Sequence, residues 1–215
     1  MKRIVAVNAG PRKKWNTAQM IASACEGAKE AGAEIEYFNL FDLDKFTGCI
    51  SCFGCKLEKN LGHCVCKDGL TQVLEAIRTS DGLIIGTPNY LSEGTASFRA
   101  LFERLVFQYI TYKSEIDSYN TRPIPVVFIM TSNAPDEAYE PDGYYHALIK
   151  KYEEMFSSFV GPTTVITVGA TKQVNDYSPY NWTRFDPETR IARYEKVFPE
   201  RLELARKAGA AMVEN

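Results

Sequence analysis

The sequence predicts one α/β domain whose five parallel strands form a doubly wound sheet, and three observations lead to this fold class. Short apolar runs of strand length recur along the chain, each followed by a stretch with helical periodicity. Strands that alternate with helices build a parallel sheet with helices on both faces. A length of 215 residues suits one domain with a complete hydrophobic core. Residues 1–215 are therefore interpreted as a single domain. We expect strand order 2-1-3-4-5, one of the common orders of doubly wound sheets, which places ligands at the carboxyl ends of strands one, three and four.

The individual elements follow from local patterns. The first strand is expected at 4–7, where an unbroken apolar run is typical of a strand buried on both faces. The other strands are expected at 34–38, 81–87, 125–130 and 163–168. Apolar residues at helical spacing predict helices at 18–33, 70–79, 97–112, 144–159 and 187–212. The last helix has a candidate break at Phe198–Pro199, because proline disrupts a helix interior.

Charge and hydropathy limit the classes of partner. The formal net charge is −2, which gives no electrostatic reason to expect nucleic acid or an anionic membrane surface. No apolar run is long enough to cross a bilayer, and the first residues lead into a strand and not a signal peptide. We therefore expect a cytoplasmic protein. Its six cysteines would then lie in a reducing compartment. Clustered thiols in such a compartment indicate metal or redox chemistry and not structural disulfides.

The loop between the first strand and the first helix has the composition of an anion site. A helix N-terminus offers free backbone N–H groups and a dipole that favours negative charge. Gly10 lets the backbone approach an anion, and Arg12 can donate several hydrogen bonds to a phosphate. Asn16 and Thr17 can donate from their side chains while capping the helix. The loop indicates a phosphate site, and the alternative is an ordinary strand–turn–helix corner with a solvated arginine.

Two further loops should meet the first one at the same edge of the sheet. Segment 87–96 is apolar and aromatic with exposed amides, which suits a flat heteroaromatic ring with polar edges. The alternative for this segment is a strand-to-helix turn whose Tyr90 is simply buried. The third loop, 131–133, follows the fourth strand. The first loop also lacks the acidic residues of a receiver domain, the cysteine of a low-molecular-weight tyrosine phosphatase and the Gly-x-Gly-x-x-Gly of a dinucleotide-binding domain.

Five cysteines gather in a turn-rich loop at about 44–68. A Cys-x-x-Cys-x-x-Cys run at Cys49, Cys52 and Cys55 resembles the ferredoxin loops that hold three irons of a [4Fe–4S] cluster, with a distant cysteine as the fourth ligand. Zinc is an alternative, held by Cys49 and Cys52 together with Cys64 and Cys66. Free or redox-active thiols are a third reading.

Several of these segments resemble a known family. The first loop, Asn8-Ala9-Gly10-Pro11-Arg12 and then Asn16-Thr17, resembles the Asn-Gly-Ser-Pro-Arg-x-x-x-Asn-Thr pattern of the flavodoxin-like NAD(P)H-dependent FMN reductases, which include the iron–sulfur flavoproteins. Segment 87–96 resembles the family's Ser-Pro-Val-Tyr-Phe-Gly-Ser-Met-Ser-Ala segment, and the likeness continues to Arg104. The resemblance spans nearly the whole chain.

The resemblance implies a flavodoxin-like fold, bound FMN and a set of contact residues. In relatives the first loop holds the FMN phosphate, segment 88–91 lines the isoalloxazine ring, and 131–133 is the last loop that contacts the flavin. The cofactor-binding residues so implied are Gly10, Arg12, Asn16, Thr17, Pro88, Asn89, Tyr90, Leu91, Thr131, Ser132 and Asn133.

The resemblance also implies an oxidoreductase. The flavin would take a hydride from NAD(P)H, or electrons from a ferredoxin-like donor, and pass them to a small-molecule acceptor or a redox protein. The flavin carries the chemistry, so no side chain is assigned as catalytic. The segment Gly62-His63-Cys64-Val65 resembles the family's Gly-x-Cys-Val, which makes Cys64 the fourth ligand beside Cys49, Cys52 and Cys55.

Two readings differ from a reductase. One is an iron–sulfur flavoprotein that carries electrons through a [4Fe–4S] cluster in the cysteine loop, and the other is a metal-stapled interaction module without turnover. The C-terminal extension at about 170–215 contains an aromatic run, 176–182, that resembles an Asp-Tyr-Ser-x-Tyr segment of a clostridial-type subgroup. We expect this run to cover a subunit interface or a flavin edge, in a homodimer or homotetramer.

The remaining candidates have ordinary structural interpretations. Cys25 is expected in the core of the first helix. Four cations at helical positions are expected on solvated helix faces, namely Arg99, Arg104, Lys150 and Lys151.

Overall fold

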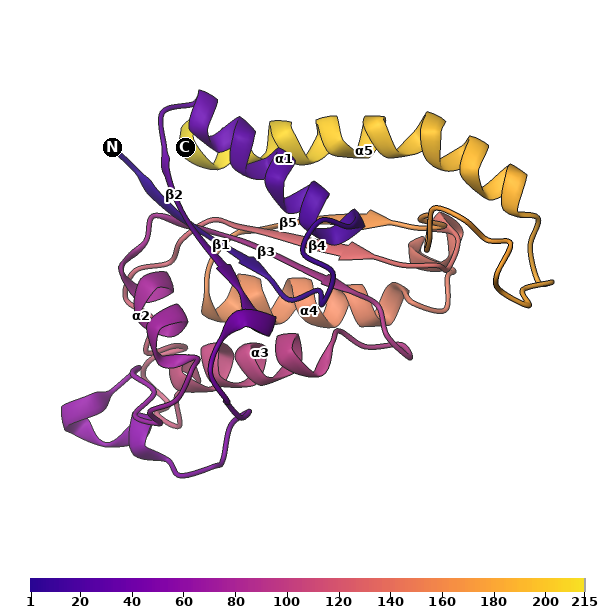
Figure 1. The fold of residues 1–215 in the computed structure, drawn as a ribbon. Helices are drawn as coiled ribbons and strands as arrows, with labels where there is room; N and C mark the ends of the chain where they lie inside the picture. The colour runs from indigo at the N-terminus through magenta and orange to yellow at the C-terminus, as the bar shows by residue number, and fades with distance from the viewer. Residues whose placement is uncertain (215) are drawn as a thin grey trace.

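The computed structural model describes residues 1–214 and contains a five-stranded parallel sheet, which confirms the predicted fold class and strand order (Figure 1). In sheet order the strands are β2 (Glu34–Asn39), β1 (Arg3–Asn8), β3 (Gly82–Pro88), β4 (Val126–Thr131) and β5 (Thr163–Val168). Every neighbouring pair is parallel. The carboxyl ends of all five strands therefore lie along one edge.

Helices cover both faces of the sheet (Figure 1). One face carries α1 (Asn16–Glu30) and α5 (Pro187–Glu214), and the other carries α2 (Thr71–Thr79), α3 (Ala96–Tyr109) and α4 (His146–Phe159). The central strands are buried on both sides, because Ile4 and Ala6 face one helical layer while Val5 and Val7 face the other. Cys25 is buried in α1, as predicted. Within residues 1–214, no helix is long and apolar enough to cross a membrane.

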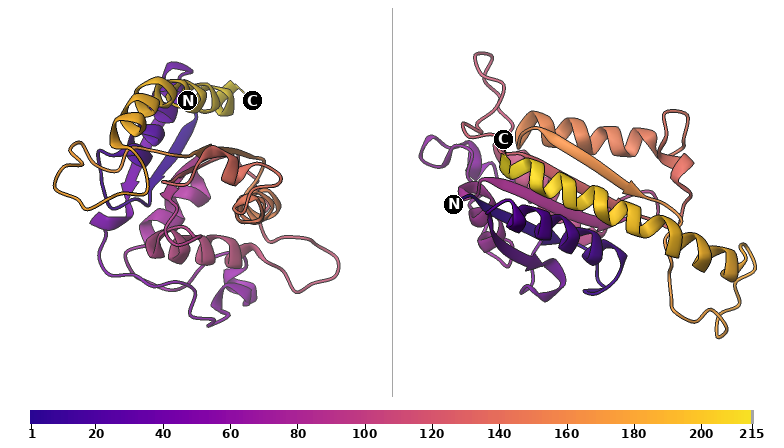
Figure 2. Two further views of the ribbon diagram at one scale, coloured as in Figure 1. Left: turned by 90° about the vertical axis from the view of Figure 1, so that its right-hand side faces the viewer. Right: turned by 90° about the horizontal axis from the view of Figure 1, so that it is seen from above.

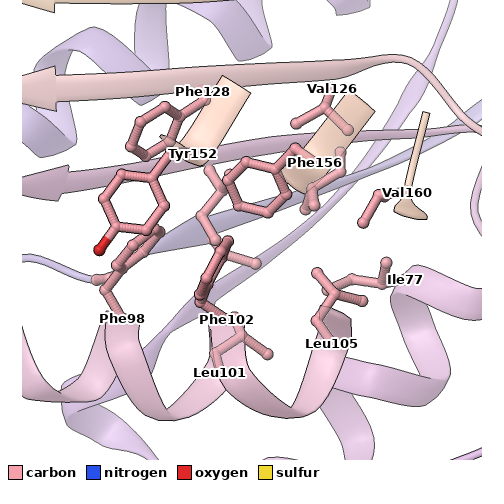
Figure 3. Close-up of a cluster of buried hydrophobic side chains, with 14 of the residues drawn as sticks. Ile77, Phe98, Leu101, Phe102, Leu105, Val126, Phe128, Tyr152, Phe156 and Val160 are labelled. Carbon is pink, nitrogen blue, oxygen red and sulfur yellow. The ribbon is translucent and has the colours of Figure 1, made fainter. Parts of the chain in front are cut away.

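An aromatic cluster holds α3 and α4 against the sheet (Figure 3). Phe102 of α3 meets Tyr152 of α4 edge to face, with ring centroids 4.8 Å apart. Phe98 of α3 lies 5.6 Å from Phe128 of β4, and Phe156 completes the group. Such offset and edge-to-face pairs add to the free energy of burial. The cluster therefore fixes the position of α3, on which both candidate sites depend.

The predicted break at Phe198–Pro199 is wrong, because α5 continues through Pro199 to Glu214. Proline removes one backbone donor and costs about 3 kcal/mol in a helix interior. Packing outweighs this cost. Phe198 is buried and stacks on Tyr194 with ring centroids 4.4 Å apart, and Ala205 and Met212 continue the buried stripe.

Two glycines allow α1 and α5 to lie in backbone contact, side by side over the sheet (Figure 2). A Cβ atom on Gly27 would lie 1.9 Å from the carbonyl oxygen of Arg206. A Cβ atom on Gly209 would lie 1.9 Å from the carbonyl oxygen of Ala24. The neighbouring atoms are backbone, so no rotamer change relieves either contact.

We expect Gly27→Ala to destabilise the protein by about 1–3 kcal/mol through overpacking. Helix propensity alone would give the opposite sign, a gain of about 1 kcal/mol. Urea unfolding followed by circular dichroism measures the difference. The matched control is Glu26→Ala, an exposed neighbour in α1 that should change stability by no more than about 0.5 kcal/mol. A Gly27→Ala protein more stable than the parent would contradict the close contact.

Candidate functional site

A cavity of about 230 Å³ opens at the carboxyl edge of the sheet. Its walls come from the loops after β1, β3, β4 and β5, which is where doubly wound folds bind ligands. The lining residues are Gly10, Pro11, Arg12, Trp15, Asn16, Thr17, Pro88, Asn89, Tyr90, Thr131, Ser132, Asn133, Thr171 and Gln173. The structure thus brings together every residue predicted for this site except Leu91.

The loop after β1 turns tightly against β3. The backbone N–H of Gly10 donates to Oδ1 of Asn8 over 3.0 Å. A Cβ atom on Gly10 would lie 3.2 Å from that oxygen and 3.4 Å from the ring of Pro88. Glycine therefore lets the first and second loops meet at the cavity floor. The hydroxyl of Thr95 donates to the carbonyl of Ala9 over 2.7 Å and ties this loop to the start of α3.

The polar side chains at the start of α1 have structural partners. Helix α1 begins at Asn16 with Trp15 at the N-cap and no side-chain cap, so the expectation that Asn16 and Thr17 cap the helix is wrong. The amide of Asn16 donates to the carbonyl of Lys172 over 2.8 Å, and the hydroxyl of Thr17 shares a 2.7 Å hydrogen bond with that of Thr131. With no side-chain cap, the backbone N–H groups of the first turn remain available to an anion.

Arg12 lies at the rim of the cavity. Its guanidinium carbon is 4.8 Å from the centre of the Trp15 ring, and its Nη1 donates to the carbonyl of Gln173. Arginine has five N–H donors, so this geometry leaves several free for a ligand. The rim therefore combines a positive charge with a helix N-terminus, the combination that binds phosphate.

The loop after β3 contains a tight turn with a strained tip. Tyr90 and Glu93 exchange backbone hydrogen bonds of 2.7 and 3.2 Å, and the two residues between them, Leu91 and Ser92, have φ of 53° and 67°. Left-handed backbone costs non-glycine residues about 1–3 kcal/mol each. The carboxylate of Glu93 holds the base of the turn by accepting from Lys151 over 2.9 Å. The side chain of Leu91 is fully exposed and lies outside the cavity lining.

The loop after β5 supplies a wall that sequence reasoning missed. The backbone N–H and hydroxyl of Thr171 donate to the carbonyl of Ser132 over 3.0 and 2.8 Å. The side chain of Gln173 donates to Oδ1 of Asn133. This wall could have been predicted from the strand order, because β5 is the parallel neighbour of β4 and the residues that follow the two strands lie at the same edge of the sheet.

The aromatic run of the extension lies beside this cavity. Tyr180 and Trp182 stack with ring centroids 4.5 Å apart, and Tyr177 donates to Oε1 of Gln173 over 2.6 Å. A second cavity, of about 370 Å³, is lined by Asn133, Gln173 and residues 181–185. The two cavities share Asn133 and Gln173, so the extension borders the first cavity directly.

The cysteine loop forms a separate site beside α2 and the C-terminal half of α3, on the lower left of Figure 1. Five sulfur-bearing residues line one small cavity of about 20 Å³, namely Cys49, Cys52, Cys55, Cys64 and Cys66. Burial raises the pKa of the Cys55 and Cys66 thiols above their usual range. Within residues 1–214, no group of three or more His, Cys, Asp or Glu is arranged to hold a single metal ion.

Helix α3 holds this loop through hydrogen bonds to both its side chains and its backbone carbonyls. The backbone N–H of Cys49 donates to Oε2 of Glu103 over 3.2 Å, and that of Cys64 donates to Oε1 of Gln108 over 3.0 Å. The ammonium of Lys56 donates to the carbonyls of Gln108 and Ile110 over 3.2 and 2.6 Å, at the helix C-terminus where a cation is favoured.

Arg104 was expected on a solvated face, and this prediction is wrong: the residue is 1% exposed. Its guanidinium donates to both carboxylate oxygens of Asp68 over 2.6 and 2.7 Å, to the carbonyl of Cys66 over 2.8 Å and to Sγ of Cys64 over 3.4 Å. Burial alone would raise the pKa of Asp68. The hydrogen bonds from Arg104 and two backbone N–H groups outweigh burial and hold that pKa below its usual range.

The donors of this cavity suit a sulfur-rich group. Gln108 is 2% exposed, and its Nε2 is the single buried side-chain nitrogen or oxygen without a hydrogen-bond partner in the described part of the chain. An unpaired buried donor costs about 1–3 kcal/mol. Five cysteines, a guanidinium and an unpaired amide around one cavity therefore fit a group whose acceptors are sulfur atoms.

Comparison with known proteins identifies the family of the chain. Residues 2–139 match the family model of the NADPH-dependent FMN reductases. An iron–sulfur flavoprotein of Methanosarcina thermophila is 31% identical over 104 residues, which are 48% of this chain and 52% of that protein. One from Methanocaldococcus jannaschii is 29% identical over 102 residues, 47% of this chain and 51% of the relative. The chain thus spans about half the length of these curated relatives.

Solved structures share the fold over nearly the full length of the chain. An NAD(P)H:quinone oxidoreductase from Methanothermobacter marburgensis has a TM-score of 0.67 at 18% identity, covering 97% of this chain and 98% of that one. An FMN-dependent NADH-azoreductase from Bacillus anthracis, in complex with FMN, has a TM-score of 0.62 at 15% identity, covering 97% and 100%. The family model covers well over half of the sequence, and the chain therefore belongs to the NADPH-dependent FMN reductase family.

Proposed function

We propose that this protein is an FMN-dependent oxidoreductase that passes electrons from NAD(P)H to a small-molecule or protein acceptor. The observation that carries the proposal is the single cavity into which the loops after β1, β3 and β4 converge, with Arg12 and the uncapped start of α1 at its rim. Family membership supports FMN as the ligand. The named activities of the structural neighbours support NAD(P)H as the donor.

The cavity has separate places for the two ends of FMN. The phosphate fits the N-terminus of α1 beside Arg12, with Gly10 allowing close approach. The ring fits between the second and third loops, where Tyr139 orients Asn89 by accepting from its amide over 3.0 Å. When bound, FMN supplies hydride acceptance and electron transfer, while these residues hold and orient it. The adjoining cavity with Trp182 suits a planar acceptor at the flavin edge.

We expect Arg12→Ala to weaken FMN binding by about 1.5–3 kcal/mol, because it removes a charge-assisted contact to the phosphate. Titration of the apoprotein with FMN, followed by flavin fluorescence, measures the dissociation constant. The control is Lys14→Ala, which removes a cation of the same loop that does not line the cavity. Equal dissociation constants for Arg12→Ala and the parent would contradict the assignment of the FMN phosphate to this loop.

We also propose that the cysteine loop holds a [4Fe–4S] cluster, ligated by Cys49, Cys52, Cys55 and Cys64, here named the cysteine quartet. All four line one cavity with an unpaired amide donor, and the curated relatives are named iron–sulfur flavoproteins. A cavity of about 20 Å³ holds little more than one water molecule, so cluster insertion has to move the sulfurs outward. In this form the protein is an electron carrier that links the cluster to FMN.

Protein made and purified without oxygen should contain about four irons and four sulfides per chain. Cys55→Ser should abolish the iron while FMN stays bound, because the flavin cavity is separate from the cysteine cavity. Cys66→Ser is the matched control and should keep the iron. Visible absorption separates the outcomes: flavin bands with broad brown absorption support the carrier, and flavin bands alone support a cluster-free reductase. A colourless protein with stoichiometric zinc would instead support the alternative of a metal-stapled interaction module without turnover.

We propose a homodimer or homotetramer, because the flavin cavity is open and an exposed apolar tip, Leu91, lies near it. Light scattering of the FMN-loaded protein at micromolar concentration should give a multiple of 24.2 kDa. A monomer mass would refute the assembly. Leu91→Asp should shift the mass toward the monomer if this tip lies in the interface, whereas Tyr112→Asp, another exposed apolar position, should not.

A further inference from the structure

The unpaired amide of Gln108 has a fixed direction. Its Oε1 accepts the 3.0 Å hydrogen bond from the backbone N–H of Cys64. A flipped amide would set its NH₂ group against that N–H donor, so the observed orientation is the one the structure allows. Gln108 lines the cysteine cavity, and its Nε2 is buried without a partner among residues 1–214. The amide is therefore a donor at the cavity wall that lacks an acceptor.

Arg104 is a second donor on the same face of α3, four residues before Gln108. Its Nε points at Sγ of Cys64 over 3.4 Å, while its other nitrogens are held by Asp68 and the carbonyl of Cys66. The helix end that carries Gln108 is held in turn by Lys56. Both donors are thus held by named hydrogen bonds, and both side chains line the cavity that the cysteines line.

The side chains that line the cavity limit the acceptors that Gln108 can reach. Among the side chains that line it, the acceptors other than Gln108 itself are the cysteine sulfurs. We propose that Gln108 donates a hydrogen bond to a sulfur atom of the iron–sulfur group held by the cysteine quartet, and that it sets the reduction potential of that group together with Arg104. This inference rests on the cluster proposed above. It adds a positioning residue that is not a ligand and that no cysteine motif reveals.

The expected effect has a definite sign. Reduction adds negative charge to an iron–sulfur group, and hydrogen bonds to its sulfurs stabilise that charge and raise the potential. Loss of the Gln108 donor should therefore favour the oxidised state. The shift should be at most about tenfold in the oxidised-to-reduced equilibrium, which is about 59 mV for a one-electron couple.

The deciding variant is Gln108→Met, which is neutral, similar in length and without an N–H donor. Parent and variant are prepared without oxygen, and iron, sulfide and FMN are counted per chain. The midpoint potential is then measured by an anaerobic redox titration followed by electron paramagnetic resonance. We expect parental FMN and iron contents with a lower midpoint potential. If Gln108→Met does not load iron, Gln108→Asn takes its place, because it is neutral and withdraws the amide by one methylene group.

The control is Asn60→Ala, which removes a hydrogen bond to Gly54 in the same loop but no residue that lines the cavity. It should keep the parental potential. An iron-loaded Gln108 variant with the parental potential would overturn the donor role and leave the cluster proposal intact. A parent protein without iron would overturn the cluster and this inference together, while the FMN proposal would be judged by flavin content alone.

Discussion

The position of α3 is the constraint on which both candidate sites depend. At its N-terminus, the hydroxyl of Thr95 accepts from the backbone N–H of Phe98 over 3.1 Å and donates to Ala9, so the helix start and the first flavin loop form one unit. Nine residues after Thr95, or about 13.5 Å along the helix, Arg104 holds the cysteine loop. The aromatic cluster of Figure 3 fixes the helix between these ends. A displacement of α3 would therefore move both sites at once.

The ion pair of Arg104 with Asp68 gives the cysteine loop a pH-dependent anchor. Because the pKa of Asp68 lies below its usual range, the pair contributes its full stability above the ordinary aspartate pKa of about 3.9. That contribution is lost as the pH falls through the lowered pKa of the folded protein. Because Arg104 is buried and Asp68 is only 13% exposed, loss of one partner should cost more than the ~0–1 kcal/mol typical of an exposed pair such as Arg78 with Glu75.

Local pattern was enough to predict the strands, because apolar runs and turn residues reflect burial and backbone conformation. The strand order and most of the residues that line the flavin cavity were predicted from the resemblance to the FMN reductases. Local pattern could not predict the role of Arg104, whose partner Asp68 lies 36 residues away and whose helical spacing resembles that of exposed cations. Nor could it predict that packing of Phe198 on Tyr194 keeps α5 continuous through Pro199. Thr171 and Gln173 were missed because they line the cavity through hydrogen bonds to Ser132 and Asn133, which lie in the loop after β4.

The backbone contact between α1 and α5 has a consequence for how the chain folds during synthesis. Gly27 in α1 contacts the backbone of Arg206 in α5, and Gly209 in α5 contacts that of Ala24 in α1, so the two helices meet although most of the sequence separates them. This helical layer is therefore complete only after α5 has been made. Until then, the apolar face formed by Ile4, Met20 and Ile21 lacks its final cover. Contacts of such long sequence separation slow folding and leave apolar surface open to aggregation. The nascent chain is therefore most vulnerable before α5 emerges from the ribosome, and chaperone dependence should be concentrated in that interval.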